Sequence, residues 1–244
     1  MTAAIQASDL HKAFGEQVVL KGLSFSVAKG ETLAVIGRSG TGKSVLLRLL
    51  IGLELPDSGS IRIQDKEVTT LRNEELSETR KKVGYLFQQG ALYDSLTVAE
   101  NVAFPMERHS KLNGSEIKAK VQELLSAVGL EEHAGKLPSD ISGGMKKRVA
   151  LARALALDPE ILLFDEPTAG LDPITAHEID LLIVEQKQKR GITSVVVTHD
   201  IHGARTFADR VALLNEGEIV AQGTMADLDK DHHPFLVEFL KGSS

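Results

Sequence analysis

Several features that would restrict the function of a protein are scarce or absent in this 244-residue chain. It has no cysteine, which excludes disulfide bonds and thiol chemistry and is compatible with the cytoplasm. It has no run of about 18 apolar residues, so we expect no membrane span. The first residues lack a basic segment followed by an apolar one, so we expect no secretory signal. Aromatic residues make up only 4% of the chain, so aliphatic side chains must fill its core.

Excess positive charge is also absent. The formal net charge is −6, whereas a general nucleic-acid-binding protein is usually basic, so we expect no nucleic-acid partner. Two short basic clusters, Arg80-Lys81-Lys82 and Lys146-Lys147-Arg148, are each interpreted as a solvated helix face rather than as a grip on a phosphate backbone.

The most informative motif is Gly37-Arg38-Ser39-Gly40-Thr41-Gly42-Lys43-Ser44, which fits the pattern G-x-x-x-x-G-K-[ST] of loops that cradle the phosphates of ATP or GTP. The glycines let the backbone fold tightly and point its N–H groups at phosphate oxygens. Lys43 reaches the terminal phosphates, and the Ser44 hydroxyl can hold Mg²⁺. An apolar run at 33–36 and a helical pattern at 45–51 flank the loop, so a chance match of a Gly/Ser turn is the weaker explanation.

Hydrophobic patterning predicts a doubly wound α/β core interrupted by a helical insert. We expect further strands at 18–20, 23–27, 60–63, 83–87, 161–164 and 192–197, and a hairpin at 211–214 and 218–221. We expect helices at 73–80, from an N-cap at Ser115 to Gly129, at 143–157, and from Asp172 to Gly191. The predicted domain covers 3–235, with core parts at about 3–88 and 159–230, a helical subdomain at about 89–158, and a tail or short helix at 231–244.

Two carboxylates, Asp165 and Glu166, directly follow the expected strand at 161–164. Ligands of such sheets gather at the carboxyl ends of the strands, where one carboxylate can hold Mg²⁺ and a second can polarise a water molecule. We assign Asp165 to the metal and Glu166 to the water. An Asp-Glu pair is common at strand ends, so the assignment depends on the phosphate loop upstream.

The segment Ser142-Gly143-Gly144-Met145 begins the second helix of the insert. Ser142 can cap that helix, and the glycines expose amide donors. Alone, the segment would be interpreted as an ordinary capped helix. Its position after the phosphate loop and Gln88, and just before Asp165, favours a role in nucleotide binding.

With this ordered set of motifs, the chain resembles the ATP-binding cassette (ABC) ATPases over nearly its whole length. The resemblance implies a RecA-like phosphate-loop core with an antiparallel β subdomain and an inserted helical subdomain, and it implies ATP and Mg²⁺ as ligands. Residues 141–145 match the signature and 169–172 match the D-loop. Gln88 matches the Q-loop glutamine, which senses Mg²⁺ and the attacking water, and His199 matches the switch histidine at the γ-phosphate.

Two positions qualify this resemblance. Phe14 falls where the family places an aromatic side chain that stacks on adenine, although a core phenylalanine fits the pattern nearly as well. The signature departs from the common Leu-Ser-Gly-Gly-Gln at Ile141 and Met145. Met145 cannot donate the hydrogen bonds that a glutamine could.

Residues 87–98, 101–105, 141–148 and the ending 239–242 are similar to the ATPase subunit of MCE-type (Mla-like) phospholipid transporters. This similarity implies a membrane permease, an MCE-type lipid-binding protein and, in some systems, a STAS-domain subunit. It also implies a peripheral position on the cytoplasmic face of the inner membrane. One chain carries one set of motifs, so the simplest assembly is a homodimer in which the second copy supplies Ser142, Gly143 and Gly144.

Three other functions fit parts of the pattern. An ABC ATPase for another cargo, such as amino acids or ions, would differ only in the subfamily stretches. A soluble ABC protein of DNA repair or translation usually has two cassettes or a long coiled-coil insertion, and the short separation between Gln88 and Ser142 leaves no room for one. A small-molecule kinase with a phosphate loop would not need the signature, Gln88 and His199 in this order.

The terminal residues Phe235, Leu236, Phe239 and Leu240 would form one apolar face if they were helical. So short a helix is marginal alone, so it must dock either on its own core or on a second copy. The sequence leaves both possibilities open.

Overall fold

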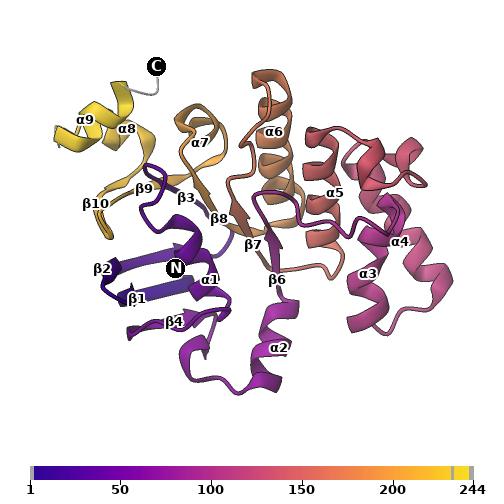
Figure 1. Ribbon diagram of the computed structural model, residues 1–244, viewed down its shortest axis with the longest axis horizontal. Coiled ribbons are helices and arrows are strands. Elements are labelled where there is room, and N and C mark those ends of the chain that lie inside the picture. The colour runs from indigo at the N-terminus through magenta and orange to yellow at the C-terminus, as the bar shows by residue number, and fades with distance from the viewer. Residues whose placement is uncertain (1–2, 232–233, 242–244) are drawn as a thin grey trace.

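Two β-sheets and a set of helices make up the part of the chain that the computed structural model describes, residues 3–231 and 234–241 (Figure 1). The larger sheet has the strand order β10-β9-β3-β8-β7-β6, and the smaller sheet has the order β2-β1-β4-β5. The strands of the larger sheet are β3 (Thr32–Ile36), β6 (Val83–Leu86), β7 (Ile161–Asp165), β8 (Thr193–Thr198), β9 (Arg210–Asn215) and β10 (Glu218–Gly223). The smaller sheet contains β1 (Ala3–Phe14), β2 (Gln17–Ala28), β4 (Ser58–Ile63) and β5 (Lys66–Glu67).

The larger sheet is parallel except for its edge strand β10, whereas the smaller sheet is antiparallel. Strands β3, β7 and β8 are buried along their whole length, which explains their continuous apolar sequences. The predicted fold class is therefore confirmed: a phosphate-loop α/β core with an antiparallel β part and an inserted helical part.

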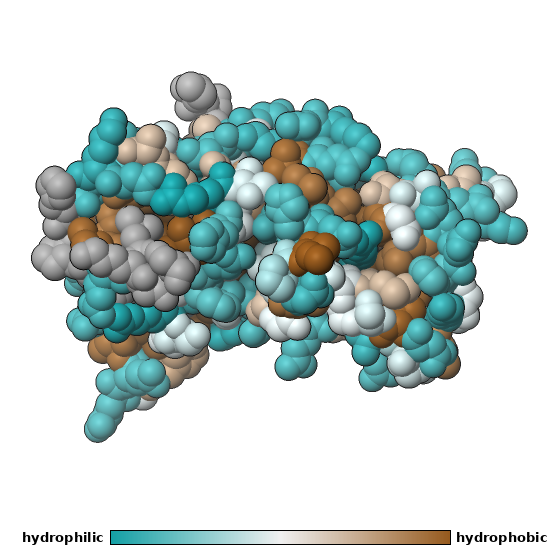
Figure 2. Space-filling model, turned by 90° about the horizontal axis from the view of Figure 1, so that it is seen from above, coloured by the Kyte–Doolittle hydropathy of each residue, from teal (hydrophilic) through white to brown (hydrophobic). Residues whose placement is uncertain are grey.

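Two hydrophobic clusters cover the two faces of the larger sheet. Ala34 and Ile36 of β3 belong to one cluster, and Leu33 and Val35 belong to the other, as the alternation of side chains along a strand requires. Aliphatic side chains dominate both clusters, as the shortage of aromatic residues predicts. Figure 2 shows one outer face, which is mostly hydrophilic with hydrophobic residues in separate patches.

The helices surround this sheet and extend away from it at one end (Figure 1). They are α1 (Lys43–Leu50), α2 (Asn73–Lys81), α3 (Val98–His109), α4 (Gly114–Ala127), α5 (Gly143–Leu155), α6 (Pro173–Arg190), α7 (Ile201–Phe207), α8 (Met225–Leu228) and α9 (Pro234–Lys241). Helices α3, α4 and α5 pack against one another and form the helical part between β6 and β7. Helix α6 begins and ends as predicted, because Asp172 caps its N-terminus and Gly191 ends it with a φ of 63°.

The structure corrects the sequence prediction at two helices. The pattern does not predict α3, because Pro105 lies inside it and proline usually ends a helix. The N-cap of α4 is Asn113 rather than Ser115, because the Asn113 Oδ1 accepts hydrogen bonds from the backbone N–H groups of Ser115 and Glu116 at 3.0 and 3.1 Å.

The structure also corrects the smaller sheet. The sequence does not predict β1, and the two strands predicted at 18–20 and 23–27 form one continuous strand, β2. The register between β1 and β2 shifts at several points along their length. Each shift interrupts the two-residue alternation on which the sequence prediction depends.

Helix α9 docks on its own chain. Leu236 and Phe239 are buried in the hydrophobic cluster that also contains the helical part, and Glu238 forms an ion pair with Arg38 at 2.6 Å. The sequence left open whether this helix docks on its own core or on a second copy. In the structure it packs against its own core. The side chains of Phe235 and Leu240, which were expected on the same face, lie outside the described residues.

Candidate functional site

The predicted phosphate loop lies between β3 and α1, and two of its glycines are needed for its shape. Gly42 has a φ of 99°, a backbone angle that residues with a side chain rarely adopt. A Cβ atom at Gly37 would lie 2.4 Å from the carbonyl oxygen of Leu214, a backbone atom of the neighbouring strand β9. Thr41 fixes the turn from within, because its hydroxyl donates to the Arg38 carbonyl at 2.9 Å.

Lys43 is the first residue of α1, and its side chain is only 5% exposed. Its Nζ donates to the carbonyl oxygens of Gly37 and Arg38 at 2.7 and 3.1 Å, and it lies 3.3 Å from Glu166 Oε1. The loop, Lys43 and Glu166 therefore meet at one point, where a positive charge faces the concave side of the loop.

Ser44 and Asp165, the neighbours of Lys43 and Glu166 in the sequence, also contact each other. The Ser44 hydroxyl donates to Asp165 Oδ1 at 2.8 Å, and the Tyr85 hydroxyl donates to Asp165 Oδ2 at 3.4 Å. Burial raises the pKa of the Asp165 carboxyl, the hydrogen bond from Ser44 acts in the opposite direction, and the charge of Glu166 raises it further. A cation beside Asp165 would relieve this cost of burying negative charge.

These residues fit Mg²⁺ by their chemistry, because a hydroxyl and a carboxylate are the hard oxygen ligands that this ion takes. Within the described ranges, no group of three or more His, Cys, Asp or Glu side chains could hold a metal.

Glu166 is held in a strained and well-defined position. Its φ is 48°, in the left-handed region that residues with side chains seldom occupy, and its N–H donates to the Val197 carbonyl at 2.9 Å. Glu166 Oε2 lies 2.8 Å from His199 Nδ1 and accepts a hydrogen bond from the His199 backbone N–H at 3.3 Å. Strain of this kind at a charged side chain is typical of functional sites.

A cavity of about 570 Å³ opens over the loop. Of the predicted site residues, it is lined by Phe14, Ser39, Gly40, Gly42, Lys43, Ser44, Gln88 and Glu166. Phe14 is 46% exposed at the rim, so the alternative that it is a core residue is wrong. Gly37 and Thr41 shape the loop without lining the cavity, and Asp165 and His199 reach it through their contacts with Ser44 and Glu166.

The predicted signature residues are not part of this cavity. Ser142 is exposed at the start of α5, where its hydroxyl accepts a hydrogen bond from the Met145 N–H at 3.3 Å. A Cβ at Gly144 would lie 2.3 Å from Thr175 Cγ2, so this glycine allows α5 to approach α6 closely. Ser142, Gly143 and Gly144 line none of the cavity above the phosphate loop of their own chain.

The interpretation of the two basic clusters as solvated helix faces is wrong for Lys147, whereas Arg80 and Arg148 are partly exposed. Lys147 is buried, and its Nζ donates to the backbone carbonyls of Gln88 and Glu166. Arg80 donates to the carbonyls of Ile51 and Gly52 beyond the end of α1, and Arg148 forms an ion pair with Glu178. The sequence offered one signal for Lys147, its position one turn after Gly144 of the signature, but no signal for its contacts with the Gln88 and Glu166 carbonyls.

A second cavity, of about 660 Å³, lies between α6 and α7 beside His199. Asp180 lines it, is only 3% exposed, and has no hydrogen-bond partner for Oδ1 among the residues that the structure describes. Burial raises the pKa of Asp180 from its usual 3.8 to about 7, and the negative charge of Asp200 at the start of α7 adds to this effect.

We expect Asp180→Asn to change how stability depends on pH. Between the unfolded pKa near 3.8 and the folded pKa near 7, the folded wild type holds one proton more than the unfolded chain, so raising the pH destabilises it. Asparagine has no carboxyl to titrate, so it removes this difference in bound protons between the folded and unfolded states. The variant should therefore gain stability relative to the wild type by up to about 1.4 kcal/mol per pH unit in this window and no more above it. Urea denaturation at four pH values between 4.5 and 8.5 measures the difference, and a difference independent of pH contradicts the assignment.

In the described part of the chain, none of the helices combines the length and the apolar composition needed to cross a membrane.

Comparison with known proteins finds a matching family model and several similar proteins. The family model described as ABC transporter matches residues 20–169. The MlaF protein of Haemophilus influenzae, named an intermembrane phospholipid transport system ATP-binding protein, is 40% identical over 98% of this chain and 91% of its own length. The chloroplastic protein TRIGALACTOSYLDIACYLGLYCEROL 3 of Arabidopsis thaliana is 42% identical over 98% of this chain and 74% of its own. The methionine import ATP-binding protein MetN of Brucella abortus is also 42% identical, over 90% of this chain and 59% of its own.

Among solved structures, the dimeric post-hydrolysis state of the ATP-binding cassette MJ0796, bound to ADP and Pi, superimposes with a TM-score of 0.83. It is 35% identical and covers 91% of this chain and 98% of that chain.

Proposed function

Since this chain belongs to the ABC transporter family and is one of its ATPases, we propose that it powers phospholipid transport by a membrane complex. The observation that carries this proposal is the match to the Haemophilus influenzae phospholipid transport ATPase, which extends over nearly the full length of both chains. The second candidate is an ATPase for the import of another cargo, which the match to MetN supports. That match is the weaker one, because it covers only 59% of the length of MetN.

The position of the signature supports a working unit of two copies. Ser142, Gly143 and Gly144 do not line the cavity of their own chain, and Ser142 is exposed and available to a neighbour. The related cassette MJ0796 is dimeric with ADP and Pi bound. We propose that two copies enclose two ATP molecules, each bound by the phosphate loop of one copy and the signature of the other.

The residues around the cavity have complementary roles in hydrolysis. Phe14 stacks on the base, and Lys43 with the loop N–H groups holds the β- and γ-phosphates. Ser44, Asp165 and Gln88 would hold Mg²⁺, which neutralises charge on the phosphate oxygens when it is bound. These contacts orient the triphosphate so that its γ-phosphorus faces Glu166.

Glu166 then acts on the attacking water. Its carboxylate orients the water and accepts a proton from it as the new O–P bond forms and the bond to ADP breaks. His199 fixes the Glu166 carboxylate through its ring and backbone N–H, and we propose that it contacts the γ-phosphate once ATP is bound. ADP and inorganic phosphate leave when the two copies separate.

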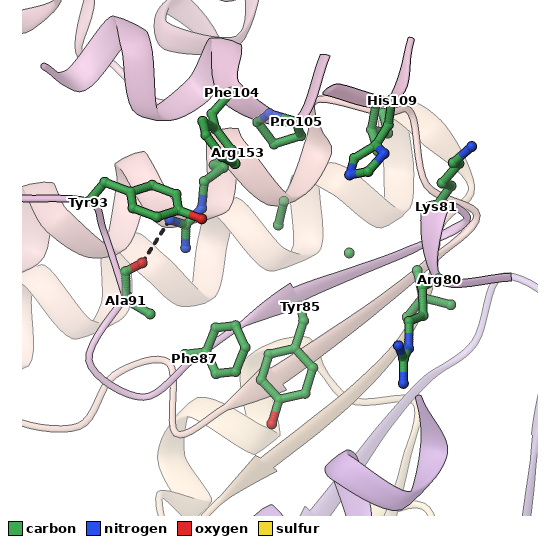
Figure 3. Close-up of a pocket in the computed structure, with 14 residues that line it drawn as sticks. Arg80, Lys81, Tyr85, Phe87, Ala91, Tyr93, Phe104, Pro105, His109 and Arg153 are labelled. Carbon is green, nitrogen blue, oxygen red and sulfur yellow. Dashed lines mark hydrogen bonds between the residues drawn. The ribbon is translucent and has the colours of Figure 1, made fainter. Parts of the chain in front are cut away.

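A groove beside β6 is our proposed contact with the permease. Its volume is about 440 Å³, and it is lined by both tyrosines of the chain and two of its eight phenylalanines: Tyr85, Tyr93, Phe87 and Phe104. Figure 3 shows Tyr85 and Phe87 on one side and Tyr93 and Phe104 on the other, with Arg80, Lys81, His109 and Arg153 around them. Such a concentration of rings, in a chain with few aromatic residues, suits a protein interface. The groove lies next to Gln88, so a permease there could act on the nucleotide site.

We further propose that the complex includes an MCE-type lipid-binding protein and, in some forms, a STAS-domain subunit, with this chain on the cytoplasmic face of the inner membrane. The test is purification of the native complex from membranes through a tag on this chain, followed by mass spectrometry of proteins and lipids. We expect a permease, an MCE-type protein and enriched phospholipid. Recovery of a permease with a periplasmic amino-acid-binding protein, and no enrichment of lipid over a mock purification, would support the importer instead.

A further inference from the structure

Lys147 occupies an unusual place for a lysine. It lies on α5, one turn after the signature residues Ser142 to Gly144, and it is 5% exposed. Its Nζ donates to the carbonyl oxygen of Gln88 and, at 3.2 Å, to that of Glu166. An ammonium group has three donors and no acceptor, so it can join two separate carbonyl groups at once.

The two carbonyls belong to the two parts of the molecule that act on the attacking water. Gln88 lies near the start of the loop from β6 to the helical part, and Glu166 follows β7 in the core. The Nζ of Lys147 therefore fixes the distance between the backbones of these two residues.

Helix α5 is well suited to transmit movement. Its residues Val149, Ala150, Leu151 and Ala152 are buried in a hydrophobic cluster that contains residues of both the helical part and the core sheet, so the helix packs against both parts. A second cation of the helix, Arg153, donates to the carbonyls of Gly90 and Ala91 at 2.7 and 2.8 Å. Figure 3 shows the contact with Ala91. Two side chains of α5 thus hold the segment from Gln88 to Ala91.

We infer that Lys147 is a positioning residue that links the two nucleotide sites of the dimer. The start of α5 contacts the nucleotide of the partner copy, while Lys147 sets the positions of Gln88 and Glu166 at the nucleotide of its own copy. Closure of the signature on one ATP therefore aligns the water-activating residues at the other. This inference rests on the shared sites of the proposed function.

The test uses Lys147→Met, which keeps most of the side-chain volume and removes the donors. We expect kcat for ATP hydrolysis to fall about 10- to 100-fold, the equivalent of losing one or two charge-assisted hydrogen bonds, and KM to change less than about threefold. The dependence of rate on ATP concentration should be steeper than hyperbolic in the wild type and hyperbolic in the variant. Lys118→Met, the same change at an exposed lysine of α4, is the matched control and should match the wild type.

Thermal unfolding shows whether Lys147→Met folds. If it does not fold, Lys147→Gln takes its place, because glutamine is smaller and keeps an N–H donor. Its kcat should lie between that of the wild type and the value expected for Lys147→Met. A kcat within twofold of the wild type in a folded variant overturns the inference, as does a loss that appears only in KM. If the wild type itself shows no ATP-dependent dimer, the shared site of the proposed function fails. If that dimer forms and Lys147→Met hydrolyses ATP normally, only the role of Lys147 fails.

Discussion

Replacing Glu166 by glutamine is expected to slow ATP hydrolysis by roughly 10²- to 10⁴-fold and to leave ATP binding intact. The amide has nearly the same shape as the carboxylate, so the cavity keeps its form, although the ion pair between Lys43 and the carboxylate is lost. It cannot accept a proton from water at neutral pH, and this step is the one that we assign to Glu166. Because binding is preserved and turnover is not, the two copies should remain closed on ATP as a stable dimer.

Three measurements separate these effects. Phosphate release gives turnover, equilibrium binding of a fluorescent ATP analogue gives affinity, and light scattering with and without ATP gives the mass. The matched control is Glu132→Gln, the same chemical change at an exposed residue of the helical part, which should hydrolyse ATP at the wild-type rate. Normal turnover in the Glu166 variant would remove that residue from the role of general base, and a monomer in the presence of ATP would contradict the shared site.

The parts of the site that the sequence predicted well are those fixed by local geometry. The phosphate loop is recognisable because its glycines, Lys43 and Ser44 must stand at set spacings between a strand and a helix. Asp165 and Glu166 were placed by the same logic, since β7 is an unbroken apolar run that ends at the carboxylates. These features depend on few residues, all close in sequence, so they can be read without knowing the packing.

The features that the sequence did not predict depend on distant contacts. Lys147 is a lysine in a basic cluster, and only the packing of α5 against the Gln88 loop and Glu166 turns it into a buried donor. In the same way, α3 tolerates Pro105 because its capping box and its packing against α4 and α5 stabilise the helix. Burial of this kind is decided by the tertiary fold, and charge pattern or propensity gives no warning of it.

Replacing Lys43 by alanine is expected to weaken ATP binding by at least about 100-fold. The Lys43 Nζ is buried on the concave side of the loop, so its hydrogen bonds to phosphate form in a poorly solvated place and their loss costs about 3 kcal/mol. The change also removes the hydrogen bonds that Nζ makes to Gly37 and Arg38, so thermal unfolding must show that the fold survives. Calorimetric titration measures the affinity; unchanged binding would contradict the phosphate-loop assignment.

Mixing two inactive variants extends this prediction to the shared site. In a dimer of Lys43→Ala with Ser142→Asp, one site combines both defects, and the other combines the intact phosphate loop of the Ser142 variant with the intact signature of the Lys43 variant. The mixture should therefore hydrolyse ATP faster than either variant alone, because a negative charge at Ser142 repels only the phosphates of the partner's nucleotide. The rate of its intact site should stay below that of a wild-type site, because the signature coupled to that site through Lys147 faces the defective site and closes on no ATP. If each chain instead held a complete site, both chains would be defective and mixing would restore nothing. The comparison needs only phosphate release from each variant and from the equimolar mixture at one total concentration.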